Sequence, residues 1–269
     1  MKLIRSLQSE WLKKSKSAVN WLTIVGGLFI PVIIIILRLV QHNKTIMGNS
    51  SDGIWMKLFL QSWQYLSIFL LPMGIILAAS LITQIEYRNN GWKQLFTSPQ
   101  SLSSIFLVKY IVVIFILLQF FILFTLGIYL TGLIPSIIYS DVPYPKEQFP
   151  VWEYASSTLN FFIDCLPILA IQYLLSLHVK NFIISIGVGL IMLVASLFAM
   201  SWAHGYIFPY CYASLQFLKA DNRISSDVNI QAWAIFYFLC FSLLNYIIFM
   251  FKYHSKSFFS FPKKTKNVL

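Results

Sequence analysis

The sequence predicts an all-α polytopic membrane protein with six transmembrane helices. Of its 269 residues, 58% are apolar and 11% are charged, whereas soluble domains are roughly half apolar and a quarter charged. Several long apolar runs are separated by short polar stretches, and a spanning helix needs about 20 such residues. We therefore expect a single membrane domain over residues 1–269.

Each expected span is an apolar run bounded by polar, basic or turn-forming residues. The first run follows a basic stretch, but it is about as long as a full span, and no small-x-small cleavage pattern follows it, so we expect an uncleaved helix and no signal peptide. The expected spans are Trp21–Val40, Leu58–Thr83, Ile105–Ile134, Ala155–Leu177, Phe182–Ser201 and Ala232–Tyr253.

The distribution of Lys and Arg predicts the orientation, because positively charged segments are retained in the cytoplasm. With the N-terminus inside, fourteen of the 20 basic residues fall on the cytoplasmic side, including those of a basic tail at 254–269. The other six fall outside, where six acidic residues balance them. Both termini are therefore expected in the cytoplasm. The net charge of +11 is explained by the membrane, and no nucleic acid partner is expected.

Residues 1–18 have the pattern of an amphipathic helix in the cytoplasmic interface. Leu3, Leu7 and Trp11 recur at steps of four, which places them on one helical stripe. We expect the basic residues at the edges and back of this helix to face anionic headgroups; they are Lys2, Arg5, Lys13 and Lys14. The alternative is an ordinary positively charged flank without helical order.

Two outer segments differ from simple turns. Residues Pro135 to Trp152 contain three further prolines, which predict an irregular connection. Residues Trp202 to Gln231 begin with an aromatic stretch, and Tyr and Trp favour the headgroup zone. We expect this second segment to dip into the outer leaflet or to lie on it.

No catalytic, cofactor-binding or metal site is predicted. The four histidines lie at span ends without metal-ligand spacing, and the three cysteines are far apart, which argues against a disulfide framework. The sequence contains no phosphate-binding loop and no other ATP-binding motif. We therefore expect no cofactor and no ATP hydrolysis by this chain alone.

Asp164 is the one acidic residue inside an expected span, and intramembrane carboxylates are candidates for functional sites. Two interpretations are open. Pro167 suits the first turn of a helix, so Asp164 can cap a helix that begins near the outer interface. Alternatively, Asp164 lines a transport pathway. A lone acid argues against a proton- or sodium-driven transporter, which normally needs more such groups.

The cytoplasmic segment between the second and third spans has the pattern of a short amphipathic helix. Trp92, Leu95 and Phe96 recur at helical spacing in a polar stretch that ends at Pro99. Such a helix offers an apolar knob to a groove on a partner, and the alternative is anchoring of these side chains in lipid. After it, Ser101 or Ser103 can cap the third span, whose cytoplasmic end is marked by Lys109.

Three features resemble the permease subunits of ABC-2 type transporters: the "LQSEWLKKSKS" stretch, the "EYRNNGWKQLFTSPQSLSSIFLVKY" segment and the six-span layout. Within that family the sequence looks most like permeases of bacteriocin or lantibiotic immunity and of peptide or drug export. Asn89-Asn90 resembles the peptide-export branch, whereas many relatives carry Gly-Thr where this chain has Gly91-Trp92.

The resemblance implies a bacterial cell-membrane exporter of two permeases, identical or paralogous, and two cytoplasmic ABC ATPase subunits, with an amphipathic peptide, drug or lipid as substrate. It also implies an N-terminal elbow helix and short re-entrant helices before the last span. It makes Glu86–Pro99 the coupling helix on the ATPase, and the residues implied are Glu86, Arg88, Gly91, Trp92, Leu95, Phe96 and Pro99. Two other classes stay open: a lipid-modifying membrane enzyme using Asp164 and His204, and a membrane anchor or sensor subunit.

Overall fold

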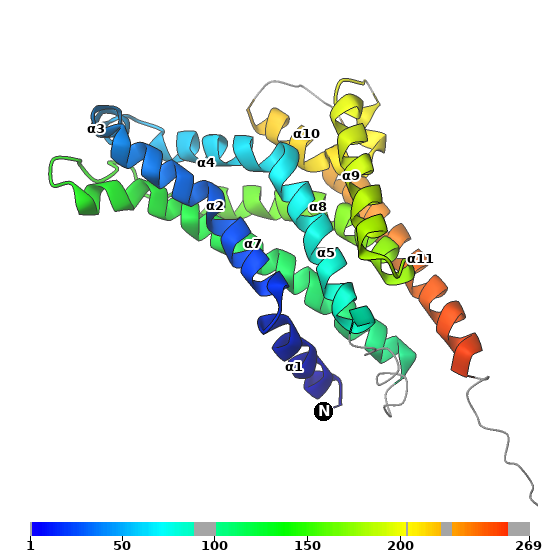
Figure 1. The fold of residues 1–269 in the computed structure, drawn as a ribbon. Coiled ribbons are helices and arrows are strands. Elements are labelled where there is room, and N and C mark those ends of the chain that lie inside the picture. The colour runs from blue at the N-terminus through cyan, green and yellow to red at the C-terminus, as the bar shows by residue number, and fades with distance from the viewer. Residues whose placement is uncertain (1, 89–100, 203, 222–227, 258–269) are drawn as a thin grey trace, which may run out of the picture.

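The computed structural model describes residues 2–88, 101–202, 204–221 and 228–257. All regular secondary structure in this part of the chain is helical, and six of its helices are long and apolar enough to cross a membrane (Figure 1). The predicted all-α fold with six spans is therefore confirmed.

Each expected span corresponds to a helix, and most of the helices are longer than expected. The second span is composite, because a π-helical turn separates its two α-helices. In chain order the spans are α2 (Ala18–Val40), α4 (Ile54–Tyr65) with η1 (Leu66–Leu70) and α5 (Leu71–Arg88), α7 (Leu102–Ile138), α8 (Val151–His178), α9 (Phe182–Ala199) and α11 (Ile230–Ser257).

The second span bends at η1, between α4 and α5 (Figure 1). A π-turn inserts an extra residue into the helical ladder and is a known cause of kinks. Pro135 lies within the last turn of α7, although we expected an irregular connection to begin there. A proline removes only one helical hydrogen bond near a helix end, so α7 continues to Ile138 and the irregular stretch is confined to 139–150.

The bundle is held together by close helix contacts and a buried aromatic core. The long helix α7 packs mainly against α2, and α8 packs against α5 and α11. A Cβ atom on Gly127 of α7 would lie 2.6 Å from Pro31 of α2, so the two backbones approach closely, as small residues allow in membranes. At the centre, Trp63 is fully buried and stacks on Phe161 with 3.6 Å between ring centroids.

Different helices lie at the two ends of the molecule (Figure 1). The N-terminal helix α1 (Lys2–Ser15), the end of α5, the start of α7 and the end of α11 lie toward one end, which we call the N-terminal face (Figure 1). Toward the opposite face lie α3 (His42–Ser50), which the sequence did not predict, and α10 (Tyr212–Ala220).

The aromatic segment before the last span forms short helices that belong to the bundle. They are η2 (Gly205–Ile207), η3 (Pro209–Cys211) and α10. Tyr210 and Tyr212 are fully buried, because η3 packs on α8 and α9 while α10 packs on α8. The depth of this segment in a bilayer stays a prediction.

Candidate functional site

The N-terminal helix packs along the first half of α7. Trp11 makes an edge contact with Phe115, with 6.4 Å between ring centroids, and Lys14 Nζ donates a hydrogen bond to Gln119 Oε1. The predicted helix is therefore present. The expectation that Lys14 faces headgroups is wrong: only 1% of it is exposed, because α7 covers it.

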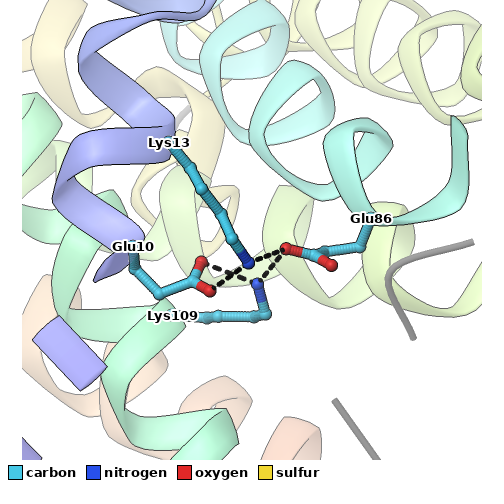
Figure 2. Close-up of polar contacts among 4 residues, drawn as sticks. All are labelled: Glu10, Lys13, Glu86 and Lys109. Carbon is cyan, nitrogen blue, oxygen red and sulfur yellow. Dashed lines mark hydrogen bonds and ion pairs between the residues drawn. The ribbon is translucent and has the colours of Figure 1, made fainter. Parts of the chain in front are cut away.

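Four charged side chains from three helices form a closed ion network at the N-terminal face (Figure 2). Lys109 Nζ of α7 lies 2.7 Å from Glu10 Oε2 of α1 and 2.8 Å from Glu86 Oε1 of α5. Lys13 Nζ of α1 lies 2.8 Å from Glu10 Oε1 and 3.0 Å from Glu86 Oε1. Each lysine bridges both carboxylates, so two positive and two negative charges balance.

Three members of this network are buried: Glu86 is 3% exposed, Glu10 8% and Lys109 9%. Burial lowers the pKa of Lys13, but hydrogen bonds and charge interactions with Glu10 and Glu86 outweigh burial and hold this pKa above its ordinary value. Lys13 is therefore positively charged at neutral pH. Removing one partner from a buried ion pair leaves an uncompensated charge and costs about 3–5 kcal/mol. The network thus specifies how α1, α5 and α7 meet.

The described residues around the network leave little space between them. The cavity beside it has a volume of about 10 Å³ and is lined by Glu10, Glu86, Lys109 and apolar neighbours. A cavity of about this size holds at most one water molecule. Among the described residues, the network therefore connects helices, and the cavity beside it is too small for a substrate.

The end of α5 is also fixed on its other side. Tyr87 directly follows Glu86, and its hydroxyl donates a hydrogen bond to the carbonyl of Leu177 near the end of α8. On the other side of residues 89–100, Ser101 caps α7 by accepting a hydrogen bond from the Ser104 amide at 3.2 Å. Ser101 is one of the two caps that we expected. Residues 89–100 thus connect a helix end held by α1, α7 and α8 to a capped helix start.

Among the residues implied in coupling, Glu86 is placed in the ion network. Arg88 ends α5, and its side chain lies outside the described part of the structure. Gly91, Trp92, Leu95, Phe96 and Pro99 also lie outside the described residues.

Asp164 lies in the middle of α8, and the expectation of a helix start near it is wrong. The helix continues through Pro167, and none of the Asp164 side chain is exposed. Gln231 Nε2 lies 3.5 Å from Asp164 Oδ2, whereas Oδ1 has no hydrogen-bond partner among the described residues. Asp164 is therefore neither a hydrated interfacial group nor a helix cap.

Asp164 and His204 do not share a site. Asp164 is buried and contacts Gln231 of α11, whereas His204 is exposed and contacts Trp202 and Tyr206. The pair proposed for a lipid-modifying enzyme is thus not brought together through a common partner.

Sequence reasoning singled out Glu86 but missed the roles of Glu10, Lys13 and Lys109. A signal was present in the charge distribution. With six acids outside and Asp164 within a span, Glu10 and Glu86 are the two acids left among fourteen basic residues on the predicted inner side. Two carboxylates among so many basic residues are expected to pair with lysines where the helix ends are buried.

Six apolar spans, a helix packed on the third of them and a closely packed ion network at one end define a polytopic helical membrane protein. The family model of the ABC-2 family transporter proteins matches residues 6–196, more than half of the chain, and the chain belongs to this family. It is therefore a membrane permease subunit of an ABC transporter and not its ATPase, and the family implies association with ABC ATPase subunits. No curated protein and no solved structure shows a significant match.

Proposed function

We propose that this permease is half of an ATP-driven exporter that moves an antimicrobial peptide, drug or other amphipathic compound out of a bacterial cell or its membrane. The single observation that carries the coupling part of this proposal is the ion network of Glu10, Lys13, Glu86 and Lys109. It ties α1 and both helices that flank residues 89–100 into one unit.

The coupling segment is Glu86–Pro99 on the cytoplasmic side, with Trp92, Leu95 and Phe96 as the knob on the ATPase. Closure of two ATPase subunits would push this knob. Because Glu86 and Lys109 join α5 to α7 at 2.8 Å, the push moves both helices together with α1. A helix pair with fixed ends transmits a rigid-body shift, whereas independently mobile ends would absorb it.

An apolar cavity in the bundle supports the proposal that the substrate is amphipathic. It has a volume of about 220 Å³ and lies between α2, α5 and α7. Its wall includes Val25 and Phe29, which are about half exposed on the outside of the bundle, and its floor includes Val113 and Leu117. A hydrocarbon chain in the bilayer therefore reaches this cavity without crossing the core of the bundle.

Asp164 is the candidate pathway residue in this scheme. It is a buried carboxyl in the middle of a span, and such groups mark transport routes in membrane proteins. Its contact with Gln231 links α8 to the first turn of α11, so a shift between these helices changes the surroundings of the carboxyl group.

The first test is purification of the tagged chain from its native membrane in mild detergent. We expect an ABC ATPase and a second permease, identical or paralogous, to purify with it. If the chain purifies alone while it remains folded, the proposed complex is wrong.

The second test separates coupling from lipid anchoring. Trp92→Ala and Phe96→Ala should weaken retention of the ATPase and lower substrate-dependent export, measured as resistance to a panel of antimicrobial peptides. Trp21→Ala is the matched control, because Trp21 is 69% exposed at the start of α2 and is an aromatic residue near the same face. If all three variants lose activity equally, the knob is a lipid anchor. Binding of an ATPase without any ATP-dependent export would indicate an anchor or sensor subunit instead.

A further inference from the structure

Three basic residues surround one pocket on the face opposite the N-terminus. The pocket has a volume of about 250 Å³ and lies between the end of α2, α3 and the start of α4. Its lining contains the charged residues Arg38, Lys44 and Lys57 together with apolar residues that include Leu37 and Leu58. None of the described residues that line it is acidic. The pocket thus offers both positive charge for an anion and apolar surface for hydrocarbon.

Arg38 is held in place by a neutral amide. Arg38 Nη2 donates a hydrogen bond to Asn49 Oδ1, and Asn49 is itself fully buried. Asn49 Nδ2 donates to Ser136 Oγ at 3.0 Å and to the Pro143 carbonyl at 2.8 Å. In addition, Thr45 Oγ1 donates to the carbonyl of Arg38 at 2.6 Å. The guanidinium group is therefore positioned in advance by α3 and α7.

The groups that hold Arg38 in place, Asn49 and Thr45, supply no negative charge. The Nε atom of Arg38 is buried and has no hydrogen-bond partner within the described part of the chain. Two acids of the adjoining connection are engaged elsewhere: Asp141 pairs with His42 at 2.6 Å, and Glu147 accepts a hydrogen bond from the Gly53 amide at 2.7 Å. A cation that is partly buried without an anion is costly. The pocket therefore suits an anionic occupant.

We propose that this pocket binds the phosphate group of an anionic phospholipid from the surrounding membrane. The Arg38 guanidinium group donates one hydrogen bond to Asn49 and has further N–H groups that can donate to phosphate oxygens. The ammonium groups of Lys44 and Lys57 add attraction for a net negative headgroup. The apolar run of α2 ends at Val40, so Arg38 lies at the edge of the hydrocarbon core, where headgroups are found. The first part of an acyl chain then lies against Leu37, an exposed apolar residue of the lining.

Three of the six basic residues expected outside line this one pocket. Lys and Arg do not help to place a segment outside as a topology signal. Their convergence on one pocket gives them a role in binding.

The test uses the purified chain in zwitterionic detergent. Binding of short-chain phosphatidylglycerol, short-chain phosphatidylcholine and inorganic phosphate is compared by native mass spectrometry and by the shift of the melting temperature. We expect phosphatidylglycerol to bind most tightly. Lys44→Gln with Lys57→Gln should weaken it by about tenfold or more, the usual effect of losing charge-assisted hydrogen bonds. Both lysines are exposed, so this variant is expected to fold, whereas Arg38→Gln also tests the groups that hold Arg38 in place.

Lys146→Gln is the matched control, because Lys146 is an exposed lysine on the adjoining connection that does not line the pocket. Equal binding by the control and the double variant would overturn the proposal. Inorganic phosphate that binds as tightly as phosphatidylglycerol would identify an anion site without a lipid and would also overturn it. If the double variant instead weakens association with a second permease and leaves lipid binding unchanged, a protein supplies the missing charge and the proposal is wrong.

Discussion

Glu86 Oε1 accepts a hydrogen bond from Lys109 Nζ at 2.8 Å, and this contact joins the last turn of α5 to the N-terminal part of α7. The proposed coupling segment, Glu86–Pro99, begins in the last turn of α5 and continues into the residues between the two helices. Lys109 also reaches Glu10 of α1 at 2.7 Å. A displacement of the segment therefore acts on three helices that are bound to one another.

Neutralising one member of this network should destabilise the protein more than neutralising two. Glu86→Gln leaves buried Lys109 with less compensating charge, and we expect a loss of about 3–5 kcal/mol, measured as a lower melting temperature in detergent. Glu86→Gln combined with Lys109→Met leaves the pair of Glu10 and Lys13 intact at 2.8 Å, so the double variant should recover much of the loss.

Glu153→Gln is the control for this series, because Glu153 is exposed in the first turn of α8. It should change the melting temperature little. A double variant that is less stable than Glu86→Gln would show that the two residues act independently and that the network does not hold α5 to α7.

Close packing of α2 and α4 on α7 predicts a sharp difference among glycine substitutions. A Cβ atom on Gly127 would lie 2.6 Å from Pro31, and one on Gly132 would lie 2.5 Å from the ring of Trp55. We expect Gly127→Ala and Gly132→Ala each to cost about 1–3 kcal/mol through overpacking. Gly74→Ala is the control, since nothing lies within 4 Å of its added methyl group. Equal melting temperatures for all three variants would contradict the observed helix contacts.

Asp164→Asn should separate folding from transport. The substitution keeps the shape of a fully buried side chain and removes a group whose charge is costly within a span. We expect the variant to be at least as stable as the original protein and to lose ATP-dependent export. Full export by Asp164→Asn would remove Asp164 from the proposed pathway, whereas unfolding would indicate a structural role.

His42 and Asp141 form a pair on the face opposite the N-terminal face. This pair should make the stability of the folded protein depend on pH in the acid range. The hydrogen bond from His42 is the main reason that the pKa of Asp141 lies below its ordinary value of 3.8. A carboxyl group with a lowered pKa stabilises the folded state above its ordinary pKa, and this contribution disappears as the pH falls through the lower, folded-state value. Asp141→Asn should therefore lower the melting temperature at neutral pH, and this effect should disappear at a pH below the folded-state pKa of Asp141.

His42→Gln should return the pKa of Asp141 toward its ordinary value, as measured by carboxyl NMR titration. An effect of Asp141→Asn that is the same at every pH would contradict this interpretation.

The extent to which the site was predictable depends on the range of each interaction. Trp92, Leu95 and Phe96 form a local helical pattern, which the sequence displays directly, although they lie outside the described residues. Glu10 and Lys109 are separated by 99 positions, and their contact depends on how α1 packs on α7. Local periodicity carries no information about such a pairing, and the one signal in the sequence, the scarcity of acids on the predicted inner side, was not used to predict it.

By itself, the sequence determined the helical class, the six spans and the family resemblance, because lipid requires long apolar segments whose backbone groups are paired internally. Only the tertiary structure decided that α8 runs unbroken through Pro167, that Asp164 is buried at its centre and that Glu86 meets Lys109. These features depend on which helix faces which, and helix packing within a membrane is set by the fit of side chains between helices and not by hydrophobicity.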